Sequence, residues 1–75
     1  MQKENLSTRI VLLRKEFGLN QSQLGNELSL SQDAISDIER GRRTTTIEKL
    51  IEIADFFNVS LDYITGRSDT RERQP

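Results

Sequence analysis

The chain has 75 residues, 33% of them hydrophobic and 31% charged, and its formal net charge is −1. This length suits one small domain and leaves no room for a second lobe. Cysteine and histidine are absent, which excludes disulfides, thiolate nucleophiles and the commonest general base and metal ligand. No apolar run approaches the ~20 residues of a membrane span, and the polar N-terminus lacks a signal-peptide core. We therefore expect a reduced, cytoplasmic protein.

The first helix is predicted over residues 7–17, because apolar residues recur there at helical spacing. Ser7 or Thr8 suits its N-cap, and Gly18 suits its end. The apolar positions are Leu6, Ile10, Leu13 and Phe17.

A second helix is predicted to begin after Asn20, where Asn20 and Gln23 have the spacing of a capping box. It runs to Leu28. Gly25 lies inside it at a cost of roughly 1 kcal/mol relative to alanine, which indicates that another stretch of backbone approaches closely there.

The third helix is predicted over residues 32–40, with Ser31 as its N-cap and Gly41 directly after it. Ala34, Ile35 and Ile38 form its apolar side. The opposite side is polar and carries Gln32, Asp33, Ser36 and Asp37.

Thr45 or Thr46 caps a predicted fourth helix that ends at Asn58, with Thr45 and Glu48 at capping-box spacing. Its expected core stripe is Ile47, Leu50, Ile51, Ala54 and Phe57, and its outer side is Glu48, Glu52 and Asp55. A solvated face or the rim of a dimer suits these three acidic residues better than a metal site.

A short fifth helix is predicted over residues 61–65, between the N-cap Ser60 and Gly66. Residues 67–75 contain no apolar residue and indicate a polar, solvated C-terminal tail.

Two short helices joined by three or four residues are typical of a helix-turn-helix, whose second helix enters the DNA major groove. Residues 7–66 carry an ordered set of matching positions. The set is Ile10, Leu13-Arg14, Gly18-Leu19-Asn20-Gln21, Leu24, Leu28, Leu30-Ser31, Ile35-Ser36, Ile38-Glu39-Arg40-Gly41, Ile47, Leu50, Ala54, Val59-Ser60-Leu61-Asp62-Tyr63-Ile64 and Gly66. With this set the chain resembles the phage-repressor and Cro-type helix-turn-helix regulators, also called the xenobiotic-response-element family. It departs from them at Gly25, where alanine is usual, and at Ser29, where glycine is common.

The resemblance implies an all-α, five-helix lambda-repressor-like domain over residues 1–66, followed by the tail 67–75. Its implied function is sequence-specific transcription regulation, most simply as a repressor, with the helix 32–40 in the major groove of an operator. The implied base-contacting residues are Gln32, Asp33, Ser36 and Asp37. The implied phosphate-contacting residues are Asn20, Gln21, Ser31, Arg40, Arg42 and Arg43. Arg14 and Glu39 are implied to form a structural ion pair.

The expected partner is double-stranded DNA with a palindromic operator, bound by a homodimer. We predict the dimer interface at Tyr63, Ile64 and Thr65, with Phe56 or Val59 nearby. No metal, cofactor, small-molecule ligand or membrane is expected, and no pairing of a base with a nucleophile indicates an enzyme.

A protein-interaction module, such as an antirepressor or an antitoxin on the same fold, is the alternative. The acidic balance favours it, since DNA-binding domains usually carry excess basic charge. Asp33 and Asp37 leave two possibilities open: each accepts a hydrogen bond from cytosine N4 or discriminates against wrong sequences.

Overall fold

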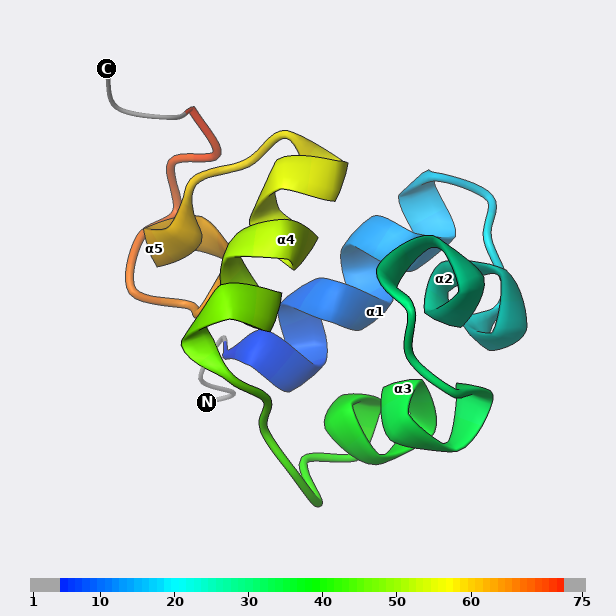
Figure 1. Cartoon of the computed structure of the whole chain (residues 1–75). Helices are drawn as coiled ribbons and strands as arrows, with labels where there is room; N and C mark the ends of the chain where they lie inside the picture. The colour runs from blue at the N-terminus through cyan, green and yellow to red at the C-terminus, as the bar shows by residue number, and fades with distance from the viewer. Residues whose placement is uncertain (1–4, 73–75) are drawn as a thin grey trace.

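Five helices follow one another along residues 5–72, the part of the chain that the computed structural model describes (Figure 1). No strand occurs in this part, so the prediction of an all-α, five-helix fold is confirmed. The helices are α1 (Leu6–Glu16), α2 (Gln21–Leu28), α3 (Gln32–Glu39), α4 (Ile47–Phe57) and α5 (Leu61–Ile64).

Side-chain caps fix where these helices begin. The predicted N-caps Asn20, Ser31, Thr46 and Ser60 each accept a backbone N–H from three residues further on. The start of α1 differs from the prediction. Asn5 is its N-cap, and Thr8 is the second member of a capping box, with its Oγ1 accepting from the Asn5 N–H at 3.0 Å.

The predicted capping box at Thr45 and Glu48 is wrong, because the cap falls one residue later. Thr46 is the N-cap of α4, and its Oγ1 accepts from the Lys49 N–H at 3.1 Å. Glu48 therefore lies in the first turn of α4 without a capping role, where a negative charge still suits the positive end of the helix dipole.

The core receives side chains from all five helices, and α3 packs against both α1 and α2. The predicted apolar side of α3 is confirmed as buried. The buried set is Ile10, Leu13, Leu24, Leu28, Ala34, Ile35, Ile38, Ile53, Ala54, Phe57, Val59, Tyr63 and Ile64.

The predicted core stripe of α4 is partly wrong. Ile47 and Ile51 are 56% and 46% exposed, whereas Ile53, outside the predicted stripe, is fully buried. The physical reason is that α4 packs against α5 and α2, and the side that meets them carries residues at i, i+3, i+4 and i+7. Those residues are Leu50, Ile53, Ala54 and Phe57.

The turn between α2 and α3 depends on Gly25, which lies inside α2, and on Ser29, the C-cap of that helix. The Leu30 N–H donates to the Gly25 carbonyl at 2.8 Å, and a Cβ on Gly25 would collide with the Leu30 carbonyl oxygen. This confirms the predicted close approach of backbone at Gly25. Ser29 adopts a left-handed conformation with φ of 56°, in the region where a side chain costs energy and glycine does not.

Residues 67–72 return across α1 and α5. This part of the predicted polar tail is mostly exposed to solvent, and it is also attached to the helices. The Ser60 N–H donates to the Arg71 carbonyl at 2.8 Å. The Arg71 guanidinium donates to both carboxylate oxygens of Glu16, at 2.9 and 2.6 Å, and to the Tyr63 hydroxyl at 3.0 Å. Sequence patterns do not reveal these contacts because they join residues far apart in the chain. The predicted tail residues 73–75 lie outside the described residues.

The contact between Glu16 and Arg71 makes the attachment of the tail pH-dependent. Its hydrogen bond from Arg71 lowers the pKa of Glu16 below the ordinary value of 4.5. The contact is therefore complete above pH 4.5 and is lost as the pH falls through the lowered pKa of Glu16. We expect the Ser60 amide, which donates to the Arg71 carbonyl, to lose protection below that pKa, where protection is its exchange rate compared with that of an unstructured chain at the same pH. Amide hydrogen exchange measured by NMR from pH 6 to pH 3 checks this, and in Glu16→Gln the Ser60 amide should be less protected throughout this range.

Candidate nucleic-acid interface

The reading face, which we define as Gln32, Asp33, Ser36 and Asp37, lies on the outer side of α3. Gln32 and Asp33 are exposed, and Ser36 and Asp37 are half-buried. None of the four side chains makes a hydrogen bond within residues 5–72, so their donors and acceptors face solvent. On the opposite side of α3, Ile35 and Ile38 are fixed in the core. The structure thus brings the predicted base-contacting residues together on one outward face.

The N-terminus of α2 presents a second group of predicted residues. The Asn20 side-chain oxygen accepts from the Gln23 N–H at 2.7 Å, which leaves the Asn20 amide group as a donor. The first N–H groups of a helix have no acceptor within it, so they attract anions. At the start of α3, Ser31 similarly accepts from the Ala34 N–H and keeps its own hydroxyl hydrogen to donate.

Gln21, the first residue of α2, has a partner that sequence analysis missed. Its Nε2 donates to Glu39 Oε1 at 3.0 Å. The two residues are far apart in the chain, and no local pattern signals the bond. A residue predicted to contact phosphate is thereby connected to the last residue of α3.

Arg14 and Glu39 form the predicted ion pair, with two hydrogen bonds. Arg14 Nε donates to Glu39 Oε2 at 2.6 Å, and a terminal nitrogen of Arg14 donates to Glu39 Oε1 at 3.1 Å. Arg14 also donates to the Leu19 carbonyl at 2.9 Å. The Glu39 side chain is only 7% exposed. The pair therefore ties α1 to α3 and to the loop before α2.

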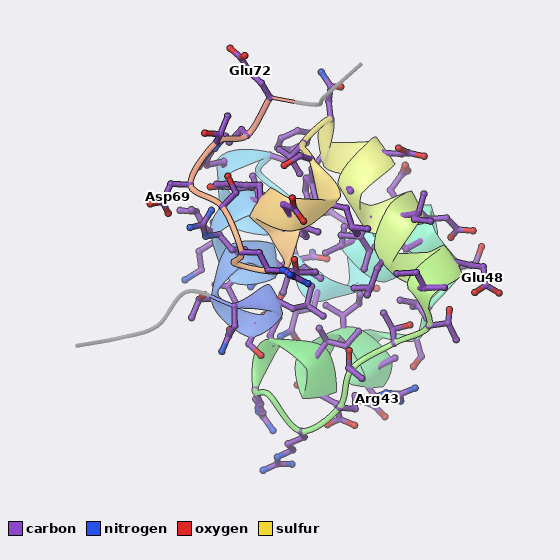
Figure 2. All side chains as sticks on the ribbon, turned by 90° about the vertical axis from the view of Figure 1, so that its left-hand side faces the viewer. Arg43, Glu48, Asp69 and Glu72 are labelled. Carbon is purple, nitrogen blue, oxygen red and sulfur yellow. The ribbon has the colours of Figure 1, made fainter. Side chains whose placement is uncertain are left out.

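Arg40, Arg42 and Arg43 are exposed in the segment after α3. Gly41, with φ of 74°, lets the chain reverse so that the Arg42 N–H donates to the Asp37 carbonyl at 2.8 Å. This hydrogen bond fixes the backbone of Arg42 to the last turn of α3. In Figure 2, Arg43 lies at the α3 end of the molecule, whereas Asp69 and Glu72 lie on the tail toward the other end. The Arg43 side chain therefore lies at the end of the molecule where α3 lies and away from these two acidic residues.

The structure places most of the predicted dimer interface inside the protomer. Tyr63 and Ile64 are 5% and 0% exposed, and only Thr65 is half-buried. The Tyr63 ring lies under the Arg9 guanidinium, 4.0 Å from the ring centroid. Because these two side chains fill the core and support the tail, they offer almost no surface to another chain. Val59 is likewise buried, whereas Phe56 is half-buried.

The described residues form neither a membrane-spanning helix nor a metal-binding cluster. Between residues 5 and 72, no helix is long and apolar enough to cross a membrane. Acidic side chains in this part of the chain do not gather into a group that could hold a metal ion.

Comparison with known proteins defines the class. Residues 10–64 match the helix-turn-helix family, and this match includes α2, α3 and the turn between them. The chain therefore belongs to this helix-turn-helix family.

Particular relatives and solved structures are similar over most of the chain. The transcriptional repressor RstR of the cryptic phage CTXphi in Vibrio cholerae is 32% identical over 69 residues, which are 92% of this chain and 62% of RstR. The HTH-type transcriptional regulator y4dJ of Sinorhizobium fredii is 37% identical over 59 residues, 77% of each chain. The P22 c2 repressor, solved in complex with a synthetic operator, superposes with a TM-score of 0.80 at 28% identity, covering 87% of this chain and 98% of that one. The chain thus spans about three fifths of the length of RstR.

Proposed function

We propose that the chain is a sequence-specific DNA-binding transcriptional regulator, most simply a repressor that occupies an operator. The observation that carries this proposal is the reading face, whose four polar side chains point outward from a helix with a buried opposite side and have no hydrogen-bond partners among the described residues. Side chains of this kind on a protruding helix suit the donor and acceptor pattern of the major groove. The similarity to the P22 c2 repressor, solved with its operator, supports the proposal.

Phosphate contacts would set the position of the protein on DNA. Asn20, Gln21 and Ser31 keep donors at the starts of α2 and α3, and Arg40, Arg42 and Arg43 supply positive charge beside them. Contacts to phosphate fix register and orientation but carry no sequence information, which is left to the reading face. In this mechanism Gln32 and Ser36 bond to base edges, and Asp33 and Asp37 accept from cytosine N4.

We also propose that the protein binds a palindromic operator as a homodimer in the cytoplasm. One small module buries too little surface for tight binding, and a two-fold dimer would place two α3 helices ~34–36 Å apart along the DNA. Since Tyr63 and Ile64 are buried, the proposed dimer surface is reduced to the half-buried side chains Thr65 and Phe56.

Selection of the preferred site from a random pool of duplex DNA tests the proposed function. The expected product is a palindrome whose half-sites are about one helical turn apart. Affinity should fall steeply with salt, with a log–log slope near −0.9 for each neutralised phosphate. If low-salt buffer yields neither enrichment nor retention on mixed-sequence DNA, the protein-interaction alternative replaces this function.

Gln32→Ala is expected to weaken binding to the selected operator by about 1–3 kcal/mol and to relax the preference at one base pair of each half-site. The measurement is fluorescence anisotropy with the operator and its three single-base variants at that position. Glu48→Gln is the matched control, since Glu48 lies on α4, away from the reading face. Equal affinity of Gln32→Ala and the unaltered protein for all four duplexes would remove Gln32 from the reading face.

A further inference from the structure

The hydrogen bond between Gln21 and Glu39 fixes a side chain that otherwise has much rotational freedom. Gln21 Nε2 donates to Glu39 Oε1 at 3.0 Å, and the Gln21 side chain makes no other hydrogen bond within residues 5–72. The acceptor is itself immobile, because Arg14 holds both carboxylate oxygens of Glu39. Gln21 is therefore attached through Glu39 to α1 and α3 as well as to its own helix.

This bond determines which way the Gln21 amide faces. A carboxylate only accepts hydrogen bonds, so the NH₂ group and not the oxygen of the amide must point at Glu39. The NH₂ group has two hydrogens, and Glu39 takes one of them. Because the amide is planar, the direction of the second hydrogen is then set as well. Without Glu39, the amide could turn its oxygen toward an approaching anion and repel it.

Arg14 explains how the Glu39 carboxylate can orient the Gln21 amide close to a DNA phosphate. An unpaired Glu39 would repel a phosphate. The Arg14 guanidinium carries the opposite charge, and its Nε lies 2.6 Å from Glu39 Oε2, so it offsets the charge of the carboxylate. A phosphate at the start of α2 therefore meets a donor from Gln21 and first-turn N–H groups of the helix, with the carboxylate behind them neutralised.

We propose that Glu39 is a positioning residue for DNA binding, which presents the second Nε2 hydrogen of Gln21 to a backbone phosphate. This inference rests on the proposed function. A side chain that is held before binding loses less conformational entropy when it binds, so the contact strengthens without any added group. Glu39 is the last residue of α3, so its bond to Gln21 also fixes the position of Gln21, on α2, relative to the reading face on α3.

The test replaces both Arg14 and Glu39 by uncharged residues, so that neither substitution leaves a buried charge without its counter-charge. In Arg14→Met, position 39 is changed either to glutamine, whose oxygen accepts from Gln21, or to methionine, which has a similar length and accepts only weakly. Each of these two proteins is compared with and without Gln21→Ala, by fluorescence anisotropy on the selected operator. Thermal unfolding of all four proteins shows that they are folded.

The expected result is that Gln21→Ala weakens binding about fivefold when residue 39 is glutamine and by less than about twofold when it is methionine. Operators with a single methylphosphonate, scanned along the backbone, identify the phosphate concerned. Removing the charge of that phosphate should abolish the effect of Gln21→Ala in the glutamine background. A purely structural role for Glu39 would alter the unfolding temperature but not this dependence on one phosphate.

An equal loss in both backgrounds would overturn the role of Glu39 while leaving DNA binding intact. Failure of the unaltered protein to bind any selected duplex would instead overturn the proposed function. A second measurement uses the unaltered protein alone, in case the variants do not fold. NMR of the free protein should show a Gln21 side-chain amide as rigid as the backbone, with one of its two hydrogens protected from exchange. A mobile amide with two equally exposed hydrogens would contradict the inference.

Discussion

Arg14→Met alone is expected to lower the free energy of unfolding by about 3–5 kcal/mol. The substitution leaves the Glu39 carboxylate, which is 7% exposed, with only the neutral Gln21 amide as a partner. A buried charge without a counter-charge costs far more than the pair itself contributes. The loss of the bond from Arg14 to the Leu19 carbonyl adds to the effect. Urea denaturation followed by circular dichroism measures the change.

The double variant Arg14→Met with Glu39→Met provides the control. Because replacing both members of a buried ion pair by apolar side chains is often neutral or stabilising, it should recover most of the loss. If Arg14→Met alone unfolds at the same urea concentration as the unaltered protein, the pair contributes nothing and the interpretation of this contact is wrong.

Ile53→Ala is expected to destabilise the protein by about 2–5 kcal/mol, which is usual for removing a large apolar side chain from a core. Ile53 is fully buried where α4 meets the rest of the protein. Ile51→Ala is the matched control: it has the same chemistry, lies two residues away on the same helix and is 46% exposed. Its effect should stay below about 1 kcal/mol, since much of that side chain already faces water.

Thermal or urea unfolding of the two variants, measured side by side, checks this contrast. The structure would be contradicted by the reverse order, with Ile51→Ala the more destabilising. That outcome would instead favour the side of α4 that the sequence pattern predicted as its core stripe.

Local signals predicted most of the fold. Asn20, Ser31 and Ser60 cap the helices that the sequence assigned to them, and Gly25 marks the close approach of α2 to the turn. These features depend on a few neighbouring residues, so the sequence shows them directly. The side of α4 that faces the core was harder to predict, because that helix is apolar on more than one side and only its packing against α5 and α2 selects Ile53.

In the candidate site, too, local features were predicted from the sequence and contacts between distant residues were not. The polar side of α3 follows from helical spacing, and the structure places those residues on one outward face. The bond from Gln21 to Glu39 and the attachment of Arg71 to Glu16 join residues distant in the chain. No period or motif indicates which of several acidic side chains an amide or a guanidinium will meet. Such pairs depend on the three-dimensional arrangement of the helices.

The turn between α2 and α3 limits how the two helices can move relative to each other. With Gly25 against Leu30 and with Ser29 in a left-handed conformation, the two helices leave each other little scope to shift or rotate. In the proposed complex with an operator, the DNA duplex would then be the partner that deforms wherever the two surfaces do not match. The energy of bending or twisting depends on base sequence, so the preferred operator should also be restricted at base pairs that no side chain touches.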